Sequence, residues 1–107
     1  MISFDDFQKV ELRTARVLEC RNHPNADRLL VLTVDLGESG ERQLVAGIRG
    51  HYAPEDLVGR TVVVVANLEP ATLRGEESRG MLLAVVDGDA VSILVPDGDV
   101  GPGLRVS

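Results

Sequence analysis

Three polar strings, each beside a strongly apolar run, carry most of the side chains that could bind a ligand. They span residues 23–28, 67–70 and 74–81. Proline, asparagine and aspartate in the first string favour a turn, and the two glycines of the third string permit close approach of another backbone. Arg74 and Arg79 supply planar guanidinium groups that bind phosphate oxygens bidentately. Because a core needs none of these strings, we interpret them as loops that contact a partner.

Residues suited to catalysis or metal binding are few. His23 and His51 are the only histidines, and Cys20 is the only cysteine. Zinc takes four ligands, which this set does not supply. The sequence contains neither the nucleophile elbow of the hydrolases nor the lysine-containing phosphate loop of nucleotide hydrolases. We therefore expect no catalytic activity, no bound metal and no cofactor.

The composition predicts one acidic domain in the cytoplasm. Of 107 residues, 44% are apolar and 26% are charged, and no apolar run approaches the roughly 20 residues that span a bilayer. The N-terminus has no basic or apolar export signal, and a single cysteine suits a reducing compartment. Seventeen acids against eleven basic residues give a net charge of −6. Exposed charges are screened over about 8 Å at physiological salt, so this balance still permits a local basic site.

The spacing of apolar residues predicts a chain built mainly of strands. A short N-terminal helical turn begins at Ser3, whose side chain can cap the backbone near Asp6. A first strand starts at Val10, and its alternation slips at residues 14–16, which we interpret as a bulge. Further strands are expected at residues 30–36, 43–48, 61–68, 81–86 and 91–95, with a compact helix at residues 54–59.

This order of elements predicts an all-β OB-fold, a five-stranded barrel with a short helix between strands three and four. The whole chain, 1–107, is expected to be one domain, with a core at about 10–86 and a C-terminal β extension at about 87–107. The consecutive valines of the fourth strand predict burial on both of its faces. In such a barrel the loop between strands one and two can lie near the loop between strands four and five. Residues 23–28 are then expected near residues 74–81.

The three strings, in this order and spacing, resemble those of the tRNA-binding domain family. Its members are free-standing proteins or C-terminal parts of many bacterial methionyl-tRNA synthetases, and a domain of the endothelial monocyte-activating polypeptide is related. The resemblance runs from residues 7–13 to residues 102–103. It implies non-catalytic binding of the outer corner of tRNA, by shape and phosphate contacts. It also implies a homodimer formed through the C-terminal extension, or an accessory part of an aminoacyl-tRNA synthetase.

The predicted tRNA contacts are four arginines, two hydrogen-bonding side chains and one methionine. The Ser78 hydroxyl can donate to a phosphate oxygen or a base edge, and the resemblance associates Asn67 and Met81 with tRNA contact. Glu76 replaces a position that is often apolar in the family, and we expect it to weaken binding. The lack of a row of aromatic residues favours folded RNA over single strands. The predicted contact residues are Arg28, Arg49, Asn67, Arg74, Ser78, Arg79 and Met81.

Several features fit a second interpretation. Residues 23–27 also suit a purely structural turn, Met81 also suits the core, and the C-terminal extension also suits a cap on its own barrel. The alternative function is a secretion chaperone of the same fold that binds unfolded peptides. The acidic charge favours that function, whereas residues 25–27 and 74–81 oppose it. A module that only dimerises and tethers a synthetase is the third interpretation.

Overall fold

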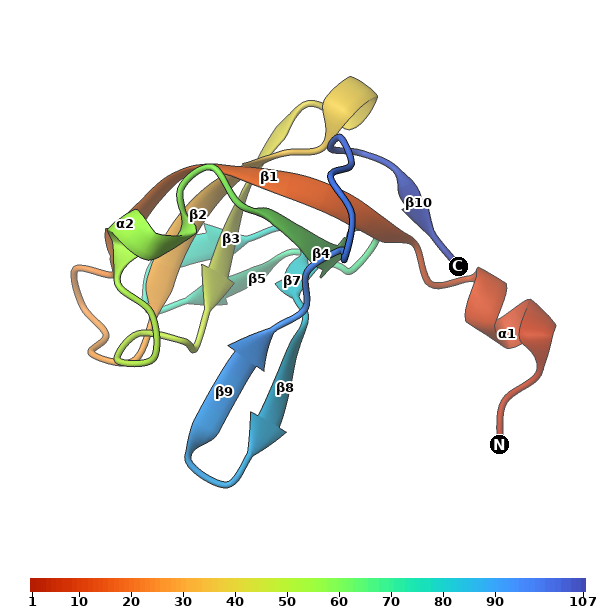
Figure 1. Cartoon of the computed structure of the whole chain (residues 1–107). Coiled ribbons are helices and arrows are strands. Elements are labelled where there is room, and N and C mark those ends of the chain that lie inside the picture. Colours follow the sequence, from red (N-terminus) through yellow and green to blue (C-terminus); the bar gives the residue numbers. More distant parts are fainter.

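The computed structural model describes all residues, 1–107, and its main feature is a curled antiparallel sheet (Figure 1). Its strands follow the order β3-β2-β1-β4-β7, and β10 pairs with the start of β1. The sheet forms an OB-like half-barrel, which confirms the predicted fold class. Its strands are β1 (Leu12–Asn22), β2 (Leu30–Asp35), β3 (Glu41–Ala46), β4 (Thr61–Val65), β7 (Met81–Leu82) and β10 (Arg105–Val106).

Two small hairpins and three short helical segments complete the fold. The Ser3 side chain accepts the Asp6 N–H at 3.1 Å, which confirms the predicted cap of α1. Helix α2 buries Leu57 completely in the barrel core. No helix is long and apolar enough to cross a membrane. The hairpins are β5 (Ala71–Leu73) with β6 (Glu76–Ser78) and β8 (Ala84–Asp87) with β9 (Ala90–Ile93); the helices are α1 (Phe4–Gln8), η1 (Gly37–Ser39) and α2 (Pro54–Leu57).

The bulge in β1 lies later than predicted. The register with β2 shifts between Val17 and Glu19, not at residues 14–16. The alternation slips earlier because Thr14 and Ala15 are both buried, although neighbouring strand residues point to opposite faces. The Thr14 hydroxyl donates to the Gly101 carbonyl at 2.8 Å on the face that the C-terminal segment covers. The sequence pattern at that point therefore reports burial on two faces, not a bulge.

The core lies inside the curl of the sheet. Val62 and Val64 of β4 are almost fully buried there, beside Leu32 of β2 and Leu44 of β3. Val63 is only half-buried, so the prediction that β4 is covered on both faces is wrong at this residue. It lies on the outer face, where it lines an apolar groove. Val65, on the same face as Val63, is only 6% exposed, so burial on both faces holds at the end of β4 and alternation is kept only in its first part.

The predicted strand at 81–86 is interrupted at Leu83. Its first part, β7, pairs with β4, while β8 turns away and pairs with β9 in a protruding hairpin (Figure 1). The Leu83 N–H bonds to the Val63 carbonyl at 3.0 Å and the Leu83 carbonyl accepts the Leu94 N–H at 3.0 Å, so this residue joins both pairings. Gly88 adopts φ 59° in the hairpin turn, in agreement with the predicted turn. Because residues 81–86 are almost all apolar, the sequence does not show that the chain changes its pairing partner from β4 to β9.

The C-terminal segment packs on its own barrel. Ile93 is buried, and its N–H donates to the Tyr52 hydroxyl at 3.1 Å. The Gly103 N–H donates to the Thr14 carbonyl at 2.7 Å, and a Cβ added to Gly103 would lie 2.4 Å from the Leu36 carbonyl oxygen. Only glycine allows this approach. The extension therefore packs on its own barrel, and the homodimer stays a prediction.

Candidate functional site

Residues 23–28 and the turn of the β5–β6 hairpin lie side by side, as predicted. The His23 Nε2 atom lies 2.8 Å from the Leu73 carbonyl oxygen, although the two residues are far apart in sequence. The prediction of a plain loop at 74–81 is wrong for its first part, because residues 71–78 form the hairpin. Arg74 (φ 53°) and Gly75 (φ 90°) form its two-residue turn. Positive φ at both positions is typical of the type I′ turns that fit the twist of a hairpin.

His23 holds the first string in place. Its side chain is buried, and its Nδ1 atom accepts the Asn25 N–H at 2.9 Å. Because Nδ1 is an acceptor, the ring hydrogen resides on Nε2 and is donated to the Leu73 carbonyl. One imidazole thus closes the turn and attaches it to the hairpin. Sequence reasoning assigned this residue no such role; the signal for it was a histidine within a polar turn.

Arg49 supports the same string from the other side. Its Nη1 donates to the carbonyls of His23 at 3.4 Å and Ala26 at 3.2 Å, and its backbone N–H bonds to the Arg28 carbonyl at 3.3 Å. The side chain is half-buried. Arg49 therefore lies beside the predicted site, but much of its donor capacity is used within the chain.

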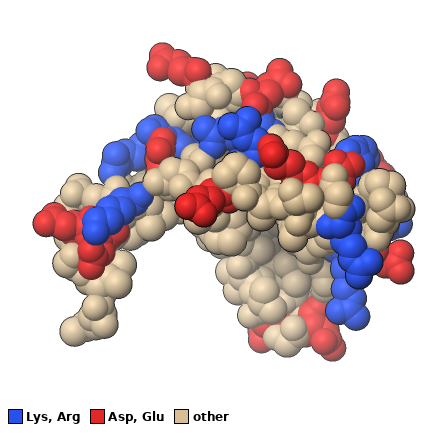
Figure 2. All heavy atoms as spheres, turned by 180° about the vertical axis from the view of Figure 1, so that it is seen from behind, with Lys and Arg blue, Asp and Glu red and all other residues tan.

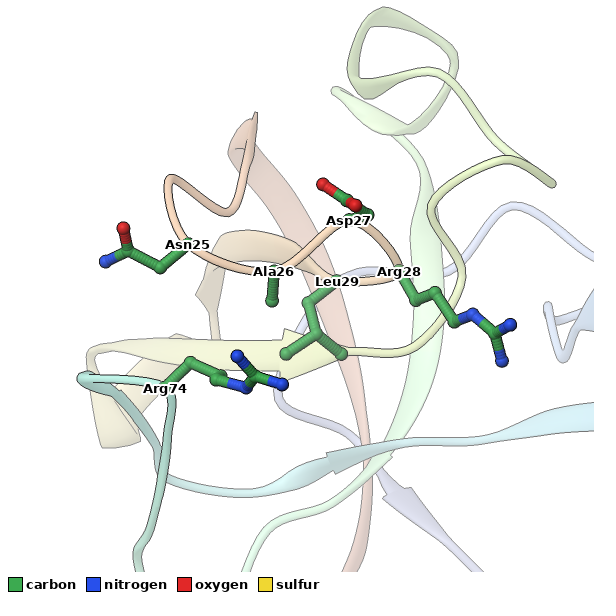
Figure 3. A pocket seen from close by; sticks show the side chains of 6 residues that line it. All are labelled: Asn25, Ala26, Asp27, Arg28, Leu29 and Arg74. Carbon is green, nitrogen blue, oxygen red and sulfur yellow. The ribbon is translucent and has the colours of Figure 1, made fainter.

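A pocket of about 410 Å³ opens where the string meets the hairpin turn. Ala26 and Leu29 lie near its centre in Figure 3, and polar side chains surround them, among them Arg28 and Arg74. Arg74 points its guanidinium group toward Leu29, whereas the Arg28 side chain extends away from it on the other side of the pocket (Figure 3). Neither side chain has a hydrogen-bond or salt-bridge partner within the chain. The pocket is lined by Asn25, Ala26, Asp27, Arg28, Leu29 and Arg74.

The two acids of the β5–β6 hairpin, Glu76 and Glu77, lie close to arginines, whereas Asp27 in the pocket lining has no such partner. Glu76 lies 2.7 Å from Arg21, and the hydrogen bond from Arg21 lowers the pKa of the Glu76 carboxyl. Gln43 donates to the same carboxylate at 3.3 Å. Arg21 thus offsets the charge of Glu76 inside the chain, and the weaker binding expected from Glu76 stays a prediction. Arg79 lies 3.8 Å from Glu77, and both side chains are more than half exposed.

Ser78 is buried at the open edge of the sheet. Its hydroxyl accepts the Val45 N–H at 3.0 Å and donates to the Gly80 carbonyl at 3.0 Å. The Arg79 N–H donates to the Gln43 carbonyl at 2.9 Å, so this segment satisfies the free edge of β3. The predicted role of Ser78 as a surface donor does not fit this position, because only 6% of the residue is exposed.

Asn67 is likewise engaged within the chain. Its Oδ1 accepts the Glu11 N–H at 2.8 Å, and its Nδ2 donates to the Lys9 carbonyl at 2.7 Å. The side chain thereby fixes the segment that precedes β1. Met81 is 47% exposed and lines a separate apolar cleft of about 270 Å³ beside β3 and the β8–β9 hairpin. Of the seven predicted residues, only Arg28 and Arg74 line the pocket.

The surface charges are unevenly distributed. Figure 2 shows basic side chains along the edge of the molecule away from α1, and acidic side chains at the tip of the β8–β9 hairpin. No three His, Cys, Asp or Glu side chains gather as a metal site. Tyr52 uses its hydroxyl within the fold and is half-buried. The arrangement provides an unpaired cationic pocket that suits a phosphate-bearing ligand.

Comparison with protein families gives one match over most of the chain. Residues 12–105 match the family model described as "Putative tRNA binding domain". The chain is 54% identical over 105 residues to methionine–tRNA ligase of Thermococcus kodakarensis. That alignment covers 98% of this chain but only 14% of the ligase.

Two solved structures are similar over the whole chain. A protein related to methionyl-tRNA synthetase, from Pyrococcus horikoshii, superposes with a TM-score of 0.93 at 31% identity, covering 100% of this chain and 98% of the other. The chaperone CsaA of Bacillus anthracis superposes with a TM-score of 0.91 at 32% identity, covering 100% and 99%. The same fold thus occurs in a protein related to methionyl-tRNA synthetase and in a chaperone.

Proposed function

Because this chain belongs to the tRNA-binding domain family, we propose that it binds folded tRNA, without catalysing a reaction, at the pocket between residues 23–28 and the β5–β6 hairpin. The observation that carries this proposal is the pair Arg28 and Arg74. In a chain with seventeen acids and eleven basic residues, both residues line one pocket, and neither side chain has a hydrogen-bond or salt-bridge partner within the chain. If the two arginines had a structural role, we would expect carboxylates of the same chain to form salt bridges with them.

The remaining predicted residues divide into two groups. Arg79 has only a long contact with Glu77 and is free to add a phosphate contact at the edge of the site. Arg49, Asn67 and Ser78 act as positioning residues, because their polar atoms hold backbone segments. Phosphate contacts of this kind fix orientation and carry little sequence information. The site therefore suits recognition of tRNA shape and backbone.

The proposal is tested by tRNA binding to two variants. The double variant Arg28→Ala, Arg74→Ala should bind tRNA roughly 100-fold or more weakly, since each charge-assisted hydrogen bond contributes about 1.5–3 kcal/mol. Arg60→Ala is the matched control, because Arg60 is exposed, lacks a side-chain hydrogen-bond or salt-bridge partner and lies between α2 and β4. Fluorescence anisotropy with magnesium-folded tRNA gives both affinities. Equal binding by the double variant and its parent would place the site elsewhere.

Salt dependence gives an independent measure of the same contacts. Three arginine–phosphate contacts, from Arg28, Arg74 and Arg79, predict a log–log slope of roughly −2 to −3 for one protomer. The double variant should retain a slope of about −1 or shallower, because only the Arg79 contact remains. A parent slope near zero would mean that the partner is not a polyanion.

We also propose a homodimer formed over the outer face of the sheet. A groove of about 660 Å³ lies there, and eight of its twelve lining residues are apolar, among them Val63, Val95 and Leu104. A stable interface buries roughly 1,000 Å² or more in total. Light scattering at micromolar concentration should give twice the mass of one chain, and Val95→Asp should give the monomer. Val86→Asp, on the β8–β9 hairpin, is the control; a monomeric parent would contradict the dimer.

The chain spans 14% of the length of the ligase that it matches, so any role in aminoacylation belongs to a larger assembly. In such an assembly we propose that this domain raises tRNA affinity in the cytoplasm while another part performs the chemistry. The second candidate function is peptide binding, favoured by the likeness to CsaA and by the apolar cleft at Met81. Anisotropy with a labelled unfolded peptide tests this candidate: saturable binding that Met81→Asp abolishes and Arg74→Ala leaves unchanged would favour it.

A further inference from the structure

The pocket at Leu29 has a shape that contacts with the phosphate backbone of RNA alone do not require. Its apolar centre is formed by Ala26 and Leu29, both half-buried, and Figure 3 shows Asn25, Asp27 and the two arginines around them. A volume of about 410 Å³ lies within the range of small-ligand sites. An exposed phosphate strip needs neither a concave apolar floor nor an acid. Both are features of a site for a nucleobase.

We propose that this pocket holds one unpaired nucleotide of a folded RNA, with guanine preferred. The inference rests on the proposed function and adds a base-specific subsite to it. The base would lie against Leu29, where a half-buried aliphatic surface can cover one face of the ring. Arg74 reaches the same surface from the hairpin turn (Figure 3), and guanidinium planes stack on bases.

The polar rim provides the chemistry that distinguishes bases. An ionised carboxylate only accepts hydrogen bonds, and Asp27 makes none within the chain. Among the bases, guanine presents two adjacent donors, its ring N–H and its amino group, which match the two oxygens of a carboxylate. Asp27 also repels phosphate, so the backbone of the nucleotide is directed toward Arg28. The Asn25 amide, also unpaired, can bond to the sugar or to the remaining base edge.

The pocket is preorganised, as a selective site requires. His23 fixes the turn through Asn25 and attaches it to Leu73. Arg49 holds the carbonyl of Ala26. The β5–β6 turn places Arg74 at φ 53°, a backbone conformation that a regular strand would not supply. All of these contacts come from the chain itself, so the segment is held in place by its own residues.

The test uses three magnesium-folded RNA hairpins that differ only in one bulged nucleotide: guanosine, adenosine or none. The parent protein should bind the guanosine bulge roughly 5- to 100-fold more tightly than the adenosine bulge, the discrimination of one good bidentate base contact. Asp27→Asn should lose that preference and keep its affinity for the fully paired hairpin. Asp99→Asn removes the same charge from an exposed site in the C-terminal segment and should retain the preference.

The outcomes separate this inference from the proposed function. Equal affinity of the parent for all three hairpins would refute the nucleotide pocket and leave phosphate binding intact. A preference that survives in Asp27→Asn would also refute it. If the parent binds neither the hairpins nor tRNA, the proposed function itself fails. Thermal unfolding of Asp27→Asn should match that of the parent, because the side chain is exposed and unpaired.

Discussion

Replacing Ser78 by alanine tests whether this residue contacts RNA or closes the sheet. The substitution removes two hydrogen bonds, from the Val45 N–H and to the Gly80 carbonyl, at a position that is 6% exposed. A typical hydrogen bond contributes about 0.5–1.5 kcal/mol, and a buried donor left unsatisfied costs about 1–3 kcal/mol. We therefore expect a loss of about 2–3 kcal/mol in the free energy of unfolding. For a domain of this size that lowers Tm by roughly 10 °C.

Calorimetry measures the Tm, and anisotropy at a temperature well below both transitions measures tRNA affinity. The expected result for Ser78→Ala is a large fall in Tm with affinity within about twofold of the parent. Ser92→Ala, at an exposed serine on β9 without a side-chain hydrogen bond, should change neither quantity. An unchanged Tm with affinity lowered tenfold would refute the structural assignment and restore Ser78 as an RNA contact.

Three further perturbations follow from the structure. Gly80→Ala should lower Tm and expression of folded protein, because the added Cβ would lie 2.9 Å from the Leu44 side chain and φ is 145°. The hydrogen bond from Arg21 lowers the folded-state pKa of Glu76. The stability that this bond contributes is therefore present above the ordinary carboxyl pKa and is lost as the pH falls through the folded-state pKa. Urea titrations of Glu76→Gln should show a smaller loss of stability on acidification than those of the parent. Burial, and to a smaller extent the nearby carboxylate of Glu55, raises the pKa of the Cys20 thiol. Labelling by a thiol reagent should therefore be slow at neutral pH and accelerate only in alkaline buffer. Fast labelling at pH 7 would contradict this.

The sequence alone determined the fold class and the closeness of two of the three polar strings. Periodicity identifies β2 and β3 because alternation is a local property of a strand with one buried face. The helix at residues 54–57 was readable from proline at its start and the glycine after it. The closeness of residues 23–28 and 74–81 followed from the order of strands in an OB-fold. The strands and the helix depend on residues that are near one another in the chain, and the closeness of the two strings depends on the order of these elements.

Tertiary structure decided which polar groups remain free. Ser78 and Asn67 look like surface donors in the sequence. In the structure each side chain accepts a hydrogen bond from a backbone N–H that is distant in the chain, that of Val45 and that of Glu11 respectively. The residues of the β5–β6 hairpin lack the β-branched pattern of a strand, so only their pairing revealed it. Hydrogen-bond partners and ion pairs across large sequence separations leave no periodic signal. For that reason only the folded chain could show that Arg74 is unpaired.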